Sequence, residues 1–297
     1  LHDALPICSY CERVACERPV PDSVVFVHNF AVPDKPIWLT FPAGAACAFE
    51  KDMAALVAEL RDSIPRAFEE DAHESARKEI VEDVNVRQRQ RLEELERVAR
   101  ESGYAIQITQ TGINVVPLIH GEPATPEAYE KLPEEERKKL DDARTVLNGP
   151  ISDFVKETRS LEKEMRARIQ DLDKKIALTA VKGPADELRE KNKDHEKAVS
   201  YLDMAEQHIL SHLSDFLNPG GQPPPGGASM MMLRPPGDEN PFRVYEVNVV
   251  VDHSGLECAP VVFESNPNFN NLFGRIERRA HFGTYTTDAT LIRAGSM

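Results

Sequence analysis

The feature that most constrains the fold is a heptad seam that runs from Leu147 to Thr179. Its members recur every three or four residues, with one additional four-residue step between Met165 and Ile169. This spacing is typical of a helix that packs lengthwise against another helix, and the additional step locally unwinds the supercoil. We therefore expect a long antiparallel coiled coil, with Pro150 marking either a kink or the true start of the helix. The seam consists of Leu147, Ile151, Phe154, Thr158, Leu161, Met165, Ile169, Leu172, Ile176 and Thr179.

Further helices are predicted before and after the seam. One begins near Ala48 and carries an apolar face, and a second covers residues 72–101, where charged side chains dominate and Gly103 follows the end. Gly183-Pro184 is expected to break the chain, and the last helix covers residues 186–217. The apolar face of the first helix consists of Phe49, Met53, Leu56, Leu60 and Ile64.

Short β-strands are predicted at both ends of the chain. Runs of β-branched and aromatic residues predict strands over residues 24–27 and 38–41, before the helices. After the helices, a longer strand is predicted over residues 242–251, with shorter strands over 260–263 and 290–293. The second half of the longer strand is continuously apolar, which is typical of a parallel-type sheet covered on both faces.

These elements predict an α/β core that is interrupted by a helical insertion. Residues 1–47 form the first part of the core, with about the first ten residues expected to be non-native because they resemble read-through of a sequencing adapter. Residues 48–217 form the insertion, with a small β-hairpin over residues 104–118 at its tip. Residues 218–240 are rich in proline and glycine and are expected to be a disordered linker. Residues 241–297 form the second part of the core, which is expected to be truncated.

Charge and composition exclude several classes of function. The chain has 297 residues and a formal net charge of −14, so its field repels phosphate backbones and we expect no nucleic-acid partner. No apolar run approaches the roughly 20 residues that span a bilayer, and no signal segment opens the chain. We therefore expect no membrane partner and a location in the bacterial cytoplasm.

No catalytic motif is found in the sequence. A P-loop and a G-x-S-x-G elbow are both absent. Asp252-His253-Ser254 contains the residue types of a triad, but neighbours on a strand point apart, so a turn at a strand end is the preferred interpretation. We expect neither a catalytic residue nor a metal site in this chain.

Two groups of residues leave a metal site as an alternative. His208 and His212 lie one helical turn apart without a third ligand, and a location at the edge of the core is preferred. Cys8, Cys11 and Cys16 leave a zinc module open, against ordinary thiols near an irregular terminus.

Four blocks of sequence resemble one family. Asn248-Val-Val-Val-Asp-His-Ser254, Ala259-Pro-Val-Val-Phe-Glu-Ser-Asn-Pro267, Asn271-Leu-Phe-Gly-Arg-Ile-Glu277 and Thr287-Asp-Ala-Thr-Leu-Ile-Arg-Ala-Gly295 are similar to the AAA+ module of the Lon-related ATP-dependent proteases of the B/C type. Val25-Phe-Val-His-Asn-Phe30 resembles a strand of the same module, and the helical insertion matches the coiled-coil insertion of that family. The resemblance implies a partial AAA+ core and covers nearly all of the chain after residue 17.

The resemblance also implies what the complete protein contains. Walker A, Walker B and a Ser–Lys protease domain are expected beyond the two ends of this chain. The parent would use ATP and Mg²⁺, although some members have degenerate ATPase sites, and no cofactor is expected for this chain alone. It would form a homo-oligomeric ring, expected to be a hexamer, that acts on unfolded or damaged proteins.

Candidate site residues follow from the same resemblance. Other AAA+ ring proteins place a Leu-Phe-Gly helix before an aromatic loop in the central pore, so Phe282, Gly283 and Tyr285 are predicted to contact substrate. An aromatic side chain beside a glycine can grip an unfolded chain through apolar contacts without reading its sequence. Arg275 and Arg278 are predicted more weakly to face the nucleotide of a neighbouring subunit, with a solvated basic surface as the alternative.

The sequence therefore predicts part of an ATP-dependent Lon-like serine protease that engages unfolded polypeptide and threads it into a Ser–Lys chamber. The alternative is a non-enzymatic coiled-coil scaffold whose small α/β base is only structural. The two functions are distinguished by the segments encoded on either side of this sequence.

Overall fold

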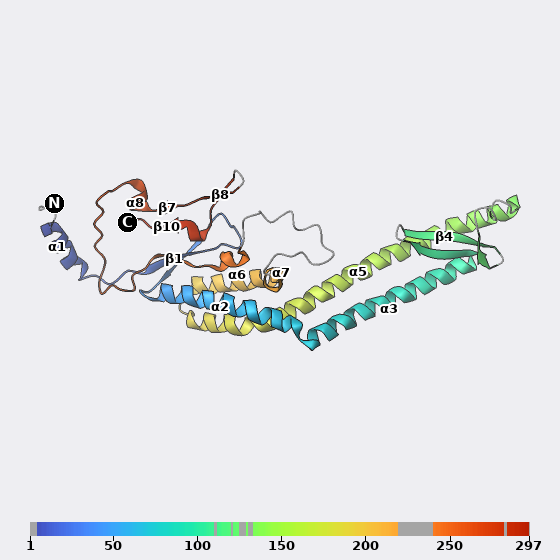
Figure 1. Cartoon of the computed structure of the whole chain (residues 1–297), viewed down its shortest axis with the longest axis horizontal. Helices are drawn as coiled ribbons and strands as arrows, with labels where there is room; N and C mark the ends of the chain where they lie inside the picture. Colours follow the sequence, from blue (N-terminus) through green and yellow to red (C-terminus); the bar gives the residue numbers. More distant parts are fainter. Residues whose placement is uncertain are drawn as a thin grey trace. The chain divides into compact units, whose positions relative to one another are not determined.

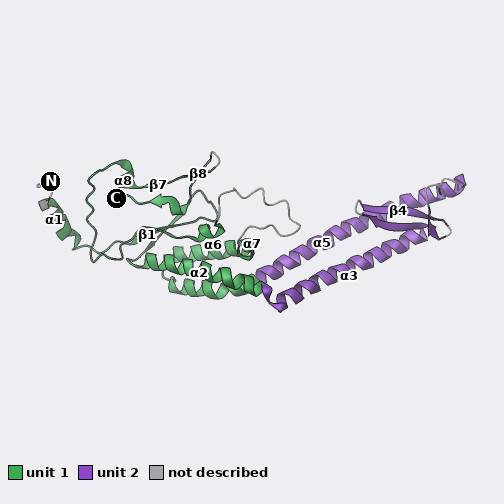
Figure 2. Cartoon of the chain, viewed as in Figure 1, with its two compact units in different colours: residues 1–68, 176–297 green, residues 69–175 purple. Residues whose placement is uncertain are grey.

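The computed structural model divides the chain into two compact units. Unit 1 consists of residues 1–68 and 176–297, and unit 2 of residues 69–175 (Figure 2). The structure describes residues 5–109, 112–119, 121–124, 129, 133–218, 240–281 and 284–296. The linker predicted at residues 218–240 lies outside the described residues except for its two end residues, Asn218 and Asn240.

Unit 2 consists of two helical segments and a small antiparallel sheet (Figure 1). The long helix is confirmed, and so is the hairpin, in which Tyr104 pairs with Pro117 and Thr109 with Gly112. Gly103 follows the first helix with a φ of 81°, a left-handed conformation that glycine adopts readily. The elements are α3 (Asp71–Glu101), β3 (Tyr104–Thr109), β4 (Gly112–Ile119), β5 (Glu122–Pro123) and α5 (Glu134–Lys191), whose last part belongs to unit 1.

Within unit 2 a thin apolar seam and ion pairs hold α3 against α5. Leu147 and Leu161 of the predicted seam are buried, whereas most of its other members are only half-buried. Polar pairs between the two helices include His73 with Asp173 at 3.0 Å, Arg87 with Glu164 at 2.8 Å, Arg91 with Glu157 at 3.1 Å, and Arg168 with Asp83. The arginine pairs are exposed, and such pairs contribute only about 0–1 kcal/mol each, so their main effect is to fix the register of the helices.

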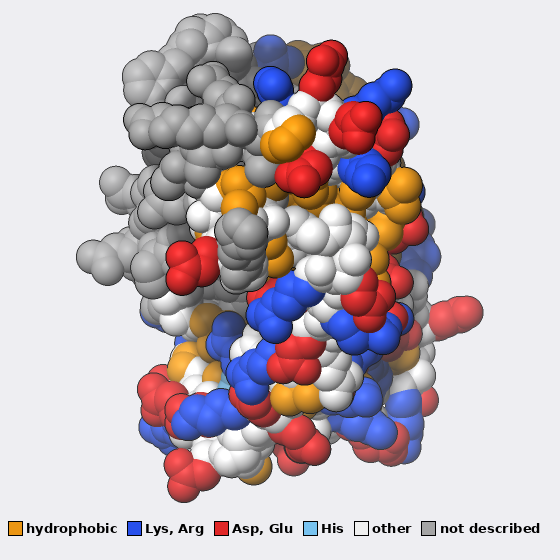
Figure 3. Space-filling view, turned by 90° about the vertical axis from the view of Figure 1, so that its right-hand side faces the viewer, with side chains coloured by type: hydrophobic (Ala, Val, Ile, Leu, Met, Phe, Trp, Pro, Cys, Tyr) orange, Lys and Arg blue, Asp and Glu red, His pale blue; other side chains and the backbone are white. Residues whose placement is uncertain are grey.

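Acidic and basic side chains alternate over much of the surface. On the face shown in Figure 3, both signs of charge are intermixed and apolar side chains occur in small groups. On this face the mixture leaves no broad region of one sign.

Unit 1 is built around the apolar face of α2 (Ala45–Glu69). All five residues predicted to form this face are buried, with exposed fractions between 0 and 7%. They join one buried cluster with side chains of α6 (Glu196–Ser211) and of the sheet. Phe41 stacks on Phe49 with ring centroids 4.9 Å apart, so the sheet and α2 share an aromatic contact. Fully burying a side chain of this size contributes about 1.5–3 kcal/mol, so this face is the main source of stability in unit 1.

The sheet of unit 1 is antiparallel, which corrects the prediction of a parallel-type sheet. Its strand order is β2-β1-β6, and both pairings of β1 are antiparallel. A parallel pairing needs a crossover of about a dozen or more residues, usually with a helix, whereas only residues 28–36 separate β1 from β2. The three strands are β1 (Ser23–Val27), β2 (Ile37–Phe41) and β6 (Asn248–Val251).

Two of the strands predicted near the C-terminus are also corrected. Residues 242–251 are not one strand, because a 3₁₀ helix, η1 (Pro241–Tyr245), precedes β6. In η1, Phe242 and Tyr245 are both buried and lie near the ring of Phe216, a packing that alternation along a strand would not allow. Residues 260–263 form no strand, and Phe263 is 63% exposed.

The predicted break at Gly183-Pro184 is wrong, since α5 continues to Lys191. Proline inside a helix removes one hydrogen bond and costs about 3 kcal/mol. On either side of Pro184, Val181 and Leu188 are buried in the core of unit 1, and their burial offsets that cost. The chain turns at Asn192 instead, where the side-chain amide donates to the Leu188 carbonyl at 2.9 Å.

The remaining helices are short. After α6, the chain continues into α7 (Leu213–Leu217), so the single helix predicted over residues 186–217 is divided into three. Among the described residues, none of the helices combines the length and apolar character needed to cross a bilayer.

A half-buried histidine, His208, is predicted to make unit 1 sensitive to pH. The ring of His208 stacks on that of His212 at 3.9 Å, and its Nδ1 lies 2.8 Å from the hydroxyl of Tyr245. Burial, together with the nearby His212 and His28, lowers the pKa of His208 to about 4. The unfolded chain, with a histidine pKa of about 6.5, therefore binds this proton more readily than the folded chain.

We predict that the stability of the chain falls as the pH is lowered from about 6.5 to 4, because in this range the unfolded chain binds a proton on His208 that the folded chain does not bind. Urea unfolding midpoints measured across this range should decrease for the wild type and decrease less for His208→Gln. Gln207→Ala, an exposed neighbour on the same helix, should keep the slope of the wild type. Equal slopes for His208→Gln and the wild type would contradict the assignment.

Candidate functional site

The C-terminal segment of unit 1 folds back on itself around a short helix, α8 (Phe269–Phe273). Asn268 caps this helix by accepting a hydrogen bond from the backbone of Asn271 at 3.0 Å. The helix ends at Phe273, and the arginines follow it in strands. The strands are β7 (Arg275–Ile276), β8 (Arg279–His281), β9 (Thr284–Thr286) and β10 (Ile292–Arg293), with the 3₁₀ helix η2 (Ala289–Leu291) before the last.

Two glycines allow the start and the end of this segment to cross. Gly274 has a φ of 79°, and a Cβ there would overlap the carbonyl oxygen of Arg293. A Cβ on Gly295 would overlap the carbonyl oxygen of Leu272 in the same way. Ser296 continues the contact by donating its backbone N–H to the Asn271 carbonyl at 2.8 Å. The glycine of the Leu-Phe-Gly motif is therefore required by a close approach of two backbones.

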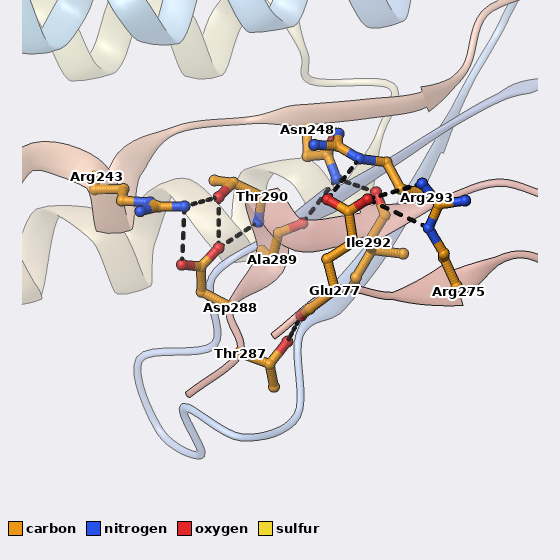
Figure 4. A network of polar contacts seen from close by, with 10 residues as sticks. All are labelled: Arg243, Asn248, Arg275, Glu277, Thr287, Asp288, Ala289, Thr290, Ile292 and Arg293. Atoms are coloured by element: carbon orange, nitrogen blue, oxygen red, sulfur yellow. Dashed lines mark hydrogen bonds and ion pairs between the residues drawn. The ribbon is translucent and has the colours of Figure 1, made fainter. Parts of the chain in front are cut away.

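Glu277 neutralises two arginines next to this crossing (Figure 4). Arg275 and Arg293 lie opposite each other in the β7–β10 pair, where like charges destabilise a ladder. One oxygen of Glu277 accepts from Arg275 at 2.9 Å, and the other accepts from Arg293 at 3.3 Å. The hydrogen bond from Arg275, with the charge of Arg293, lowers the pKa of the Glu277 carboxyl below its ordinary value. Glu277 therefore remains charged and fixes both arginines.

Asn248 connects this segment to the core sheet. Its side-chain amide donates to the carbonyls of Ala289 at 2.8 Å and Ile292 at 2.9 Å (Figure 4). Asn248 lies in β6, which pairs with β1 of the core. One polar side chain within an otherwise apolar strand thus holds η2 and β10 against the core sheet.

A second group of polar contacts lies at the N-terminal end of η2. Asp288 caps η2 by accepting from the backbone of Thr290 at 2.8 Å, and Arg243 of η1 pairs with its other oxygen at 3.2 Å. Arg243 is only 16% exposed, so this ion pair is better shielded from solvent than the arginine pairs of unit 2. The residues on both sides of β8 and β9 are therefore fixed by short-range polar contacts.

β8 and β9 form an antiparallel hairpin above this base. Arg279 pairs with Thr286, Ala280 with Tyr285, and His281 with Thr284. The predicted substrate residues Phe282 and Gly283 lie outside the described residues, between the two strands in sequence. Tyr285 lies in β9, so its backbone belongs to the hairpin. The assignment of these three residues to substrate contact stays a prediction.

The two predicted nucleotide arginines have different surroundings. Arg275 is already paired with Glu277, so it is a structural residue in this chain. Arg278 is exposed and has no ion pair within the part of the chain that the structure describes. Their role toward a nucleotide remains a prediction.

The described residues do not fit the phosphates of ATP. Phosphate cradles use several backbone N–H groups of a glycine-rich loop at a helix N-terminus, together with a lysine. Gly44 leads into α2 with a φ of 88°, but the first turn of that helix has no basic residue. The neighbouring position is acidic, since burial and the Asp252 carboxylate raise the pKa of the Cys47 thiol. A phosphate would meet a carboxylate there.

The structure also bears on the Asp252-His253-Ser254 run and on the metal sites that the sequence left as alternatives. Asp252 accepts from the backbone and the hydroxyl of Ser254 at 3.0 and 2.7 Å, which confirms a turn after β6. The hydroxyl of Ser254 thus bonds a carboxylate and not an imidazole. Among the described residues, no group of three or more His, Cys, Asp or Glu side chains is arranged to hold a metal ion.

Two comparisons with protein families match parts of the chain. Residues 257–297 match the family described as LonB-like, AAA domain, and residues 23–56 match the Lon-like LonC helical domain. The two matches support the predicted relationship to the Lon-related proteases. No curated protein matches the chain.

Each of the two matched regions contains elements of unit 1. The AAA match contains α8, the glycine crossing and the β8–β9 hairpin. The helical match begins at β1 and ends within α2, so it includes strands that the sequence analysis assigned to the AAA+ core. The division at residues 47, 217 and 240 stays a prediction.

The sequence analysis missed the residues that hold the base together. Asn248, Glu277, Arg293 and Gly295 lie in the blocks that carry the resemblance, but no structural role was predicted for them, and the structure places them around β7 and β10. Asn248 gave the clearest signal, since it is a lone amide in the run Val247-Asn-Val-Val-Val251. A polar side chain buried in such a strand requires hydrogen-bond partners.

We predict that Gly295→Ala separates the crossing of residues 272–274 and 293–296, because the added methyl group overlaps the Leu272 carbonyl. Amide exchange in these two stretches should become faster in the variant, while exchange in α2 remains unchanged. Gly255→Ala is the matched control, since a Cβ at Gly255 meets no atom within 4 Å. Unchanged exchange in Gly295→Ala would show that the crossing does not stabilise the segment.

Proposed function

We propose that this chain is the polypeptide-handling part of an ATP-dependent Lon-like serine protease. In this proposal the β8–β9 hairpin contacts the unfolded polypeptide as it is threaded toward a Ser–Lys chamber. The observation that carries the proposal is the fixed base of the hairpin. Asn248, Glu277 and the glycine crossing fasten both of its ends within a segment that matches a LonB-like AAA domain.

A hairpin that moves a polypeptide must be held firmly at both ends, because otherwise the hairpin and not the polypeptide is displaced. A short antiparallel pair is only marginally stable alone, so it needs contacts with neighbouring segments. Here both ends are attached to neighbouring segments by charged and amide side chains. Aromatic groups at positions 282 and 285 would supply apolar contacts that do not depend on the sequence of the substrate.

The other activities of the proposed protease reside outside the residues described above. ATP and Mg²⁺ would be bound by a phosphate loop that this chain does not contain, and peptide hydrolysis would be carried out by a Ser–Lys pair elsewhere in the protein. We propose a homo-oligomeric ring in the bacterial cytoplasm, with unfolded or damaged proteins as substrates. A hexamer and a role of Arg278 beside the nucleotide of a neighbouring subunit belong to the same proposal.

A non-enzymatic scaffold is the second candidate. Unit 2 has its own small core around Tyr104, whose hydroxyl donates to the Leu140 carbonyl at 2.8 Å, and exposes Ile108 and Val146. Such a unit can bind a partner without any chemistry. Extending the reading frame at both ends distinguishes the two functions, because only the protease requires a phosphate loop upstream and a Ser–Lys domain downstream.

We predict that Tyr285→Ala, in the complete protease that carries this chain, slows the degradation of folded protein substrates several-fold. Cleavage of short peptides should be spared, because peptides reach the chamber without being pulled. Thr286→Ala, in the same strand, is the matched control and should degrade both substrates at the rate of the wild type.

The measurement is the rate of loss of a folded fluorescent protein beside that of a fluorogenic peptide. Equal rates for Tyr285→Ala and the wild type on the folded protein would contradict the role of the hairpin. A parallel loss on the peptide would indicate damage to the chamber and not to substrate handling.

A further inference from the structure

Two cysteines that are far apart in the sequence lie in contact. The Sγ atoms of Cys16 and Cys258 are 2.9 Å apart, although 242 positions separate the residues in the chain. Both are free thiols, with Cys16 exposed and Cys258 half-buried. We propose that Cys16 and Cys258 form a redox-reactive dithiol site that closes to a disulfide by exchange with a small-molecule disulfide of the glutathione type.

Backbone contacts explain why these two thiols meet. The segment before β1 and the segment after β6 continue the antiparallel alignment of the two strands. The backbone N–H of His253 donates to the Ser23 hydroxyl at 3.0 Å, and the Ala259 N–H donates to the Arg18 carbonyl at 3.4 Å. Cys16 lies just after α1 (Leu5–Ala15), and Cys258 immediately precedes Ala259. The pair is therefore placed by the fold of unit 1 and not by the helix that carries Cys8 and Cys11.

The distance allows a bond with little movement. A disulfide has an S–S length of about 2.05 Å, so the two sulfurs must approach by less than about 1 Å. Effective concentrations in such intramolecular pairs far exceed those of free thiols in solution, which favours closure over a mixed disulfide. The hydrogen bond between the two thiols, with burial, raises the pKa of Cys258. Cys16, which is exposed, is accordingly the first of the two to react with a disulfide from solution.

The exchange is balanced in two steps. The Cys16 thiolate attacks one sulfur of the small-molecule disulfide, forming a mixed disulfide and releasing one small thiolate. The Cys258 thiolate then attacks the Cys16 sulfur, forming the Cys16–Cys258 bond and releasing the second small thiolate. The two protein thiols are oxidised, the small disulfide is reduced, and the two thiol protons end on the released thiols.

The bond would fasten the connection between β6 and α8 to the chain that enters β1. Residues 256–264 of this connection contain no helix or strand, and Val262 and Phe263 are exposed. Oxidation would restrict this connection, which leads directly into α8 and the hairpin base. The site is thus independent of the proposed hairpin contact with substrate, and each can fail without the other.

The test is oxidation of the full chain with oxidised glutathione, followed by alkylation and peptide mapping by mass spectrometry. Free thiols should fall from five per chain to three, with Cys16 and Cys258 joined in one peptide pair. A reducing agent should restore all five. Cys47→Ser is the matched control and should still form the bond.

Two variants make the assignment specific. Cys258→Ser should lose the cross-linked peptide and retain a glutathione adduct on Cys16, which is the trapped first intermediate. The double variant Cys8→Ser/Cys11→Ser should form the bond as the wild type does. Pairing of Cys16 mainly with Cys8 or Cys11, pairing between two chains, or no loss of thiols in the wild type would each overturn the proposal.

Discussion

The packing of α2 against the antiparallel sheet is the interaction on which the rest of unit 1 depends. Phe49, Met53 and Leu60 are almost completely buried there, beside Phe41 of β2 and the buried face of α6. The same cluster includes Val181 and Leu188, which keep α5 helical through Gly183-Pro184. The apolar contacts thus decide both the position of the sheet and the place where the long helix ends.

Polar contacts connect this core to the β8–β9 hairpin. β1 belongs to the core and pairs with β6, and Asn248 of β6 donates hydrogen bonds to the backbone carbonyls of Ala289 in η2 and Ile292 in β10. The crossing at Gly274 and the ion pairs of Glu277 then fix the two ends of β8 and β9. No step in this sequence of contacts requires a ligand, so the base of the hairpin is formed by the chain itself. The proposal that this hairpin contacts polypeptide rests on this fixed base and on the match to a LonB-like AAA domain.

Local periodicity predicted the helices and the hairpin of unit 2 well. The spacing from Phe49 to Ile64 predicted the buried face of α2, because the apolar residues of a helix face recur every three or four positions and can be recognised within a few turns. The pairing of β1 with its neighbours could not be predicted in this way, since strand direction depends on contacts between distant residues. Pro184 was taken for a break because propensity was considered without the core that surrounds it. The resemblance located the hairpin but not Glu277 or Gly295, whose roles appear only when residues 272–277 meet 292–296 in space.

The account is tested most directly by photo-crosslinking of an unfolded polypeptide to the chain. A photoreactive amino acid placed at position 284, in the β8–β9 hairpin, is compared with one placed at position 109, in the hairpin of unit 2. With a fluorescent unfolded protein as the probe, the account predicts strong labelling from position 284 and little from position 109. Labelling from position 109 alone would contradict it and would assign polypeptide binding to unit 2.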